Sequence, residues 1–125
     1  MKRRNARVLV VEDDTTLRET LTEVLVDEGH EVRSAAHGHE ALEHLDGWEP
    51  HVILLDVMMP IMDAFAFRVR QRQLGVAADA QTVVISAARD LESAAERLEA
   101  DGWIAKPFGL DEVVNVVDRL LERAS

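Results

Sequence analysis

The side chains best suited to chemistry stand at the ends of short aliphatic runs. They are, in chain order, Glu12, Asp13, Asp14, Asp56, Ser86 and Lys106. The run before Asp56, Val52 to Leu55, contains no polar residue, which is typical of a parallel strand covered on both faces. Asp56 is therefore predicted at the point where that strand leaves its sheet.

Carboxylates gathered in this way favour a divalent cation. Acidic groups within a few ångströms of each other repel and take up protons unless a cation keeps them ionised. Oxygen ligands without histidine or cysteine favour Mg²⁺, which commonly shares its coordination shell with a phosphate. Lys106 adds a point charge suited to a phosphate oxygen, and Ser86 adds a hydrogen-bond donor. Asp56 can then act as a carboxylate nucleophile that forms an acyl phosphate.

The elements that position these residues follow from the alternation of aliphatic runs with segments of helical period. Strands are predicted at 7–11, 31–35, 51–55, 81–87 and 102–106. Helices are predicted from a cap at Asp14, Thr15 or Thr16 to Gly29, and then at about 40–45, 64–74, 89–100 and 110–123. This alternation predicts an α/β fold, a parallel sheet with helices on both faces. Right-handed crossovers bring the carboxyl ends of all strands to one edge, where such folds bind ligands.

Composition limits the classes of function. The 125 residues suit one domain, and a net charge of −10 argues against binding the phosphate backbone of nucleic acids. The absence of cysteine excludes disulfides and thiolate metal sites and fits a reducing, cytoplasmic location. The basic start, "MKRRNAR", lacks the apolar region of a signal peptide and is interpreted as solvated. No apolar run is long enough to span a membrane.

Several residues are interpreted as structural rather than functional. Asp14 is predicted to cap a helix. His37 and His39 have no third ligand nearby and are expected to face solvent. Trp48 is expected to cover the edge of the sheet, and Met59 and Met62 to fill the core. The acids of the fourth helical segment are expected to form a solvated face; they are Asp90, Glu92, Glu96 and Glu99.

Four motifs carry a resemblance to a known family. The segments "VLVVEDD", "VILLDVMMP", "VVISA" and "WIAKPF" occur in an order and spacing similar to those of the receiver domains of two-component response regulators. The resemblance extends from about Arg7 to Arg123. It implies that residues 1–125 form a single receiver domain. It implies a flavodoxin-like, doubly wound (βα)5 fold with the strand order 2-1-3-4-5.

The resemblance also implies roles at the acceptor and the metal site. Asp56 matches the aspartate that accepts a phosphoryl group. Glu12 and Asp13 match the acidic pair that binds Mg²⁺, with Asp13 the direct ligand and Glu12 acting mostly through water. Asp56 itself and the backbone carbonyl of Met58 match the remaining protein ligands of the metal.

Three further residues match the family's switch. Ser86 matches the hydroxyl that turns toward the phosphoryl oxygen, and Lys106 matches the lysine that pairs with the same group. The Lys106-Pro107 peptide is expected to be cis. Trp103 stands where the family usually has Tyr or Phe as a rotameric switch.

The implied function is a signalling switch rather than an enzyme with a separate substrate. A sensor histidine kinase or phosphotransfer protein is the expected donor, and the target is expected to bind the face made by residues 89–100, 102–106 and 110–123. The helical pattern ends two residues before the last residue, so no output domain is expected within these 125 residues. A stand-alone regulator and a piece of a hybrid protein both remain open.

Two departures from the family pattern concern the switch. Ile61 and Ala64 stand where many receivers have glycine, so the loop after Asp56 is expected to take a different turn or carry strain. Trp103 is bulkier than the usual ring, so an inward swing is expected to be hindered.

Two alternatives from other classes are weighed. A phosphatase or phosphotransferase with an aspartyl nucleophile commonly needs a second acid two positions later, and that position is Met58. A receiver-like scaffold that is not regulated by phosphorylation is disfavoured by the full set of site residues, although the altered loop keeps it open.

Overall fold

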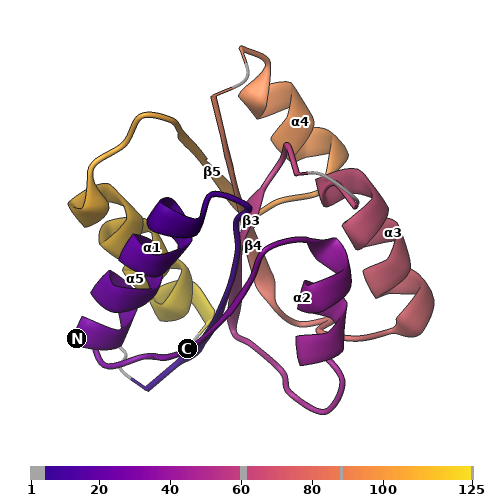
Figure 1. Ribbon diagram of the computed structural model, residues 1–125, viewed down its shortest axis with the longest axis horizontal. Coiled ribbons are helices and arrows are strands. Elements are labelled where there is room, and N and C mark those ends of the chain that lie inside the picture. The colour runs from indigo at the N-terminus through magenta and orange to yellow at the C-terminus, as the bar shows by residue number, and fades with distance from the viewer. Residues whose placement is uncertain (1–4, 60–61, 88, 125) are drawn as a thin grey trace.

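The computed structural model describes residues 5–59, 62–87 and 89–124. Within these residues, five strands alternate with five helices (Figure 1). The strands are β1 (Arg7–Val11), β2 (Glu31–Ala35), β3 (Val52–Asp56), β4 (Gln81–Ser86) and β5 (Gly102–Ala105). The helices are α1 (Thr15–Asp27), α2 (Gly38–His44), α3 (Ala64–Leu74), α4 (Leu91–Arg97) and α5 (Leu110–Ala124).

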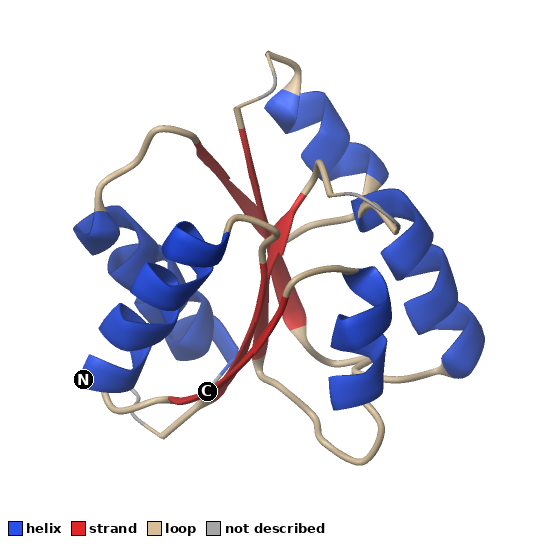
Figure 2. Ribbon diagram, viewed as in Figure 1, coloured by secondary structure: helices blue, strands red, loops and turns tan. Residues whose placement is uncertain are grey.

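The strands form one parallel sheet in the order β2-β1-β3-β4-β5. Helices α1 and α5 cover one face, and α2, α3 and α4 cover the other (Figure 2). Because both faces are covered, every residue of β3 is buried, which explains the uninterrupted aliphatic run in the sequence. The predicted α/β architecture and the flavodoxin-like strand order are both confirmed.

Two apolar cores lie on opposite faces of the sheet. Successive side chains of a strand point to opposite faces, so Leu9 and Val11 of β1 enter one core while Val8 and Val10 enter the other. The first core includes Phe67 of α3, and the second includes residues of α1 and α5. The sheet is thus packed on both faces, and this packing fixes the positions of the carboxyl ends of its strands.

The caps of the helices test the predicted boundaries. Asp14 caps α1 as predicted, its Oδ1 accepting a hydrogen bond of 3.0 Å from the amide of Leu17. The prediction for His37 was wrong: this side chain is partly buried, and its Nδ1 accepts a bond of 3.3 Å from the amide of Glu40. Because His37 supplies this cap, α2 begins at Gly38 rather than near Glu40.

Helix α4 is shorter than the predicted segment 89–100 and spans Leu91–Arg97. Glu99 has a φ of 55°, outside the right-handed helical region, and this ends the helix. The acids Asp90, Glu92, Glu96 and Glu99 are exposed, as expected for a solvated face. The expected strain at Ala64 is absent, because this residue lies in the first turn of α3; Ile61 lies outside the described residues.

Trp48 covers the edge strand β2, as predicted. Its side chain is buried, and its indole Nε1 donates a hydrogen bond of 2.9 Å to Oε2 of Glu31. The guanidinium of Arg33 lies 4.5 Å from the centroid of the ring. Met59 is buried and Met62 packs against the first core, as expected for both. None of the helices in the described ranges has the length and apolarity needed to cross a bilayer.

The first core predicts a large effect of truncating its central aromatic ring. Phe67 is fully buried, so Phe67→Ala should lower the free energy of unfolding by about 3–5 kcal/mol. Urea denaturation followed by circular dichroism measures this change. Val69→Ala, on the exposed side of the same helix, should cost less than about 0.5 kcal/mol. Equal effects of the two substitutions would contradict the assignment of this core.

Candidate functional site

The register of the sheet brings the polar residues of the sequence to one level. Val11 of β1 pairs with Leu55 of β3, so Glu12 and Asp56 follow as neighbours on adjacent strands. Asp56 in turn pairs with Ile85 of β4, which places Ser86 one residue beyond it. Ser86 pairs with Ala105, and Lys106 follows. Parallel pairing therefore aligns four separate segments at the carboxyl edge.

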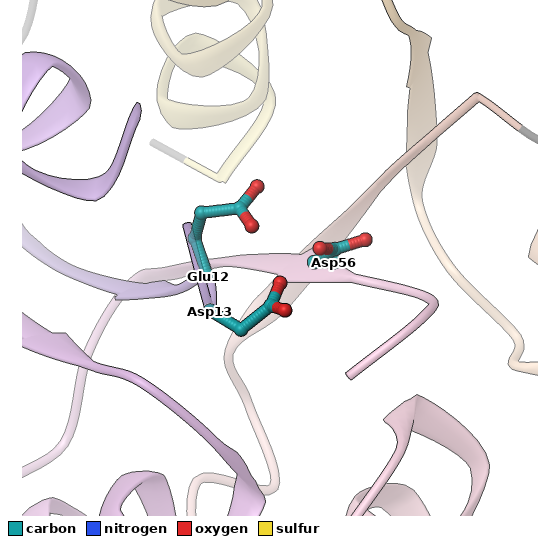
Figure 3. Close-up of side chains that lie close together, drawn as sticks. All are labelled: Glu12, Asp13 and Asp56. Atoms are coloured by element: carbon teal, nitrogen blue, oxygen red, sulfur yellow. The ribbon is translucent and has the colours of Figure 1, made fainter. Parts of the chain in front are cut away.

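Three carboxylates meet at this edge. One oxygen from each of Glu12, Asp13 and Asp56 lies within 4.8 Å of the others. Glu12 and Asp56 are buried and Asp13 is exposed, so the cluster opens to solvent on the side of Asp13. Figure 3 shows the three carboxylates directed toward a common space between the ends of β1 and β3. Such a set of hard oxygen donors fits a divalent cation of the Mg²⁺ type.

Lys106 supplies the cation that the protein itself places at this cluster. Its Nζ lies 3.0 Å from Oε1 of Glu12 and 3.5 Å from Oδ2 of Asp56. Burial opposes the charge of Lys106, but its hydrogen bond with Glu12 and the charges of Asp56 and Glu12 together raise its pKa. Lys106 is therefore held charged between two buried acids. The peptide bond between Lys106 and Pro107 is cis, as expected.

Asp56 is the acid that the fold perturbs most clearly. Burial raises its pKa, the hydrogen bond and charge of Glu12 raise it further, and the value reaches about 7. The charge of Lys106 and the amide of Met58, which donates a bond of 3.2 Å to Oδ1 of Asp56, oppose this shift without cancelling it. One lysine is thus insufficient to keep the cluster fully ionised, and a second cation would complete its charge balance.

The cluster lines an open hollow of about 520 Å³. Its lining consists of Glu12, Asp13, Asp14, Asp56, Met58, Ser86, Ala87 and Lys106. The structure thus brings Ser86 and Met58 to the same hollow as the carboxylates and the lysine, as expected from the sequence. The side chain of Ser86 is buried, whereas that of Met58 is 70% exposed and accessible to solvent beside Asp56.

Trp103 is the predicted site residue that the structure leaves outside this hollow. It lies on β5 with 48% of its surface exposed, beside a separate hollow of about 410 Å³ between β5 and α5. Trp103 therefore lines a different hollow from the carboxylates.

Sequence reasoning missed one residue that supports the acidic segment. Arg18 of α1 donates a hydrogen bond of 2.8 Å from Nη1 to the backbone carbonyl of Glu12. Asp14 adds a second support, since its amide donates to Oε2 of Glu12 at 3.1 Å. The signal for Arg18 was its place one turn after the cap Asp14, where a basic side chain can reach back over the preceding loop.

Fold and site together define a flavodoxin-like α/β protein. At the carboxyl edge of its sheet lies a hollow lined by carboxylates that could hold a cation. The family model for the response regulator receiver domain matches residues 8–118. The chain belongs to this family.

The relatives and solved structures agree with this assignment. Over 124 residues the chain is 37% identical to the response regulator MprA of Mycobacterium sp. (strain KMS), an alignment covering 95% of this chain and 52% of that protein. The chain thus spans about half the length of the curated relatives it matches.

Among solved structures, the receiver domain of the Francisella response regulator 1452 has a TM-score of 0.85 and 25% identity, covering 97% of this chain and all of that one. The chemotaxis protein CheY4 of Vibrio cholerae has a TM-score of 0.83 and 29% identity, covering 92% and 98%.

The raised pKa of Asp56 predicts how stability depends on pH without divalent cations. The folded state holds the proton up to about pH 7 and the unfolded state only to the ordinary aspartate pKa of 3.8, so the free energy of unfolding falls as pH rises between these values. Asp56→Asn removes this penalty and should stabilise the protein above pH 7 by up to about 4 kcal/mol. Urea denaturation across this pH range measures the difference, which should shrink toward pH 4.

The control for this pH dependence is Asp46→Asn, which changes an exposed acid outside the site. Its effect on the free energy of unfolding should be small. A stabilisation by Asp56→Asn that stays constant from pH 4 to pH 8 would contradict the electrostatic explanation.

Proposed function

We propose that this chain is a phosphorylation-activated switch in which Asp56 accepts a phosphoryl group. The observation that carries the proposal is the meeting of a buried Asp56 with Glu12, Asp13 and Lys106 in one open hollow. A receiver domain with a carboxylate nucleophile, an acidic pair and a lysine contains the groups that phosphoryl transfer to aspartate requires. Membership of the receiver family supports the same conclusion.

The reaction is a single displacement at phosphorus. A carboxylate oxygen of Asp56 forms the new P–O bond, and the bond from phosphorus to the nitrogen of a phosphohistidine breaks, leaving the electron pair on the nitrogen. Negative charge spreads over the three equatorial oxygens, so the protein's task is positioning and electrostatic stabilisation. Lys106 and the hydroxyl of Ser86 would act on these oxygens, since both residues line the hollow of Asp56.

Mg²⁺ would be held by Asp13, Asp56 and the backbone carbonyl of Met58, with Glu12 acting through water. When bound, the ion would neutralise charge on the carboxylates and on the phosphoryl oxygens. The donor set supports this choice, since it consists of oxygen atoms from a compact acidic cluster. Ionisation of Asp56 against its raised pKa is then coupled to binding of the ion, which should weaken as pH falls below about 7.

The partners follow from the same proposal. A sensor histidine kinase or phosphotransfer protein would supply the phosphoryl group, in keeping with the relatives that are named response regulators. A downstream protein would bind the face made by α4, β5 and α5, where Trp103 would act with Ser86 as a switch. A cytoplasmic location is proposed on the absence of cysteine, and binding to nucleic acid by this chain is disfavoured by its net charge of −10.

Neither alternative gains support from the site. An aspartyl phosphatase commonly has a second acid two positions after its nucleophile, and the exposed methionine at position 58 supplies no proton. A scaffold without phosphorylation has no need of a lysine held between two buried acids. Phosphorylation remains the function that uses the whole cluster.

Incubation with Mg²⁺ and acetyl phosphate should add one phosphoryl group, because the site holds the nucleophile and the groups that stabilise transfer. Intact mass spectrometry measures the addition. Asp56→Asn should abolish it, while Asp79→Asn, an exposed acid at the other end of the sheet, should leave it unchanged. Modification of Asp56→Asn to the extent seen for the unmodified sequence would refute the assignment of Asp56.

A second expectation concerns the emission of Trp103, which the chain's other tryptophan would obscure. In a Trp48→Phe background, Mg²⁺ should change the emission of Trp103, because cation binding rearranges the charges around Lys106 at the end of the same strand. Fluorescence titration measures the change, and magnesium binding is checked by calorimetry. An unchanged spectrum at saturation would show that the ring does not sense the site.

A further inference from the structure

Arg68 of α3 makes an unusually complete set of hydrogen bonds. Its Nε donates to the carbonyl of Leu98 at 3.1 Å, and its Nη2 donates to the carbonyl of Glu99 at 3.4 Å. Its Nη1 donates to Oε1 of Gln71 at 3.0 Å and to Oγ1 of Thr82 at 3.2 Å. These contacts connect α3, the start of β4 and the segment that follows α4.

The acceptors of Arg68 are themselves fixed. Gln71 is buried, and its Nε2 donates to the carbonyl of Ala77 at 3.1 Å. Thr82 is fully buried, and its backbone amide donates to Oδ2 of Asp101 at 2.8 Å. Buried polar groups with satisfied partners resist displacement, because moving one of them leaves the others unpaired. The guanidinium is therefore held from two sides within the protein.

The two carbonyls that Arg68 binds belong to Leu98 and Glu99, the residues that follow α4. The amide of Glu99 donates to the carbonyl of Glu96 at 3.0 Å, and that of Ala100 donates to the carbonyl of Ala95 at 2.9 Å. This pair of bonds is a Schellman motif, in which Glu99 takes the left-handed position that usually belongs to glycine. A cation at this end also complements the negative end of the helix.

Two side-chain contacts strengthen the same end. Arg72 forms an ion pair of 2.8 Å with Oε2 of Glu99, and the guanidinium of Arg97 lies 4.8 Å from the centroid of the Phe65 ring. Both contacts join α3 to the last residue of α4 or to Glu99, two residues after it. The unfavourable φ of Glu99 is thus opposed by several interactions that all come from α3.

The N-terminal end of α4 is fastened differently. Its cap residue, Asp90, makes no side-chain hydrogen bond to the helix, whereas Asp14, His37 and Asp63 cap α1, α2 and α3. This end also follows Ser86, which lines the hollow of Asp56. β4 therefore leads from Thr82, beside the Arg68 contacts, to Ser86, beside the phosphoacceptor.

We infer that Arg68 is an anchor that fixes the C-terminal end of α4, so that α4 moves by rotation about this end. A change at Ser86 then displaces the N-terminal turn of α4 and changes the α4-β5-α5 face without releasing α4 from α3. Arg68 is a positioning residue for this motion and touches none of the reacting groups. The anchor itself is independent of the proposed function, while its use during phosphorylation rests on that function.

NMR-detected amide exchange tests the anchor in the unmodified protein. In the wild type, the amides of Leu98, Glu99 and Ala100 should exchange more slowly than that of Ala94, which bonds to the carbonyl of Asp90. Arg68→Met keeps a long apolar side chain but removes all four bonds, so exchange at 98–100 should become faster by on the order of tenfold. Arg70→Met, which removes an exposed arginine two residues further along α3, should leave these rates unchanged.

A second, more conservative variant tests the same contacts in case Arg68→Met does not fold. Thr82→Val keeps the β-branched shape and removes one acceptor of Arg68, so a smaller acceleration at 98–100 is expected while the circular dichroism spectrum stays native. Equal protection of Ala94 and residues 98–100 in the wild type, or wild-type exchange in a folded Arg68→Met, would overturn the inference.

The motion is tested by repeating the exchange with Mg²⁺ and acetyl phosphate. Exchange at Ala94 should change while exchange at 98–100 stays within about twofold of its unmodified rate. Release of both ends together would overturn the rotation. Intact mass reports phosphorylation separately, so failure to add a phosphoryl group would count against the proposed function, and the exchange rates of the unmodified variants would still decide the anchor.

Discussion

The structure depends on one electrostatic constraint, the crowding of three carboxylates at the carboxyl edge of the sheet. Glu12 and Asp56 are buried there, and burial of like charges is unfavourable unless cations or protons offset it. Lys106 meets part of this need through contacts of 3.0 Å and 3.5 Å. The repulsion that Lys106 does not offset raises the pKa of Asp56. A further positive charge at the site would therefore be favourable.

The carboxylates stay close together despite their repulsion because the surrounding fold holds them in position. The central strands are packed between two cores, and their register fixes the spacing of the acidic side chains. Arg18 and Asp14 hold the segment around Glu12, so the repulsion cannot be relieved by moving the loop. In the proposed function, a cation or phosphoryl group would change the charge of this site, and the response would occur in less tightly held elements.

The two ends of β4 lie in different environments. Ser86 belongs to the charged hollow, and Thr82 belongs to the contacts of Arg68 beneath α4. Polar groups buried at the second end increase the cost of displacing α4 as a whole. We therefore infer that the N-terminal end of α4 is coupled to the acidic hollow through Ser86, whereas its C-terminal end is restrained by Arg68. Neither the composition nor the length of α4 reveals this difference between its ends.

The sequence alone determined the alternation of elements, because aliphatic runs and helical periodicity are local patterns. It determined the bounds of α3 and the cap at Asp14, where local signals act on the same helix. The gathering of Asp56, Glu12 and Lys106 also followed, since parallel strands end at a common edge. The C-terminal boundary of α4 did not follow, because it depends on Glu99, whose carbonyl and side chain are bound by arginines of the distant helix α3.

Tertiary structure decided the quantities that depend on distance and burial. The pKa of Asp56 near 7 requires the exclusion of water and the approach of Glu12, which no spacing in the sequence reveals. The Arg68 contacts join residues up to 31 positions apart and replace solvation that an arginine on a helix surface would ordinarily keep. Local chemistry thus fixed which groups the protein has, and long-range packing fixed what each group experiences.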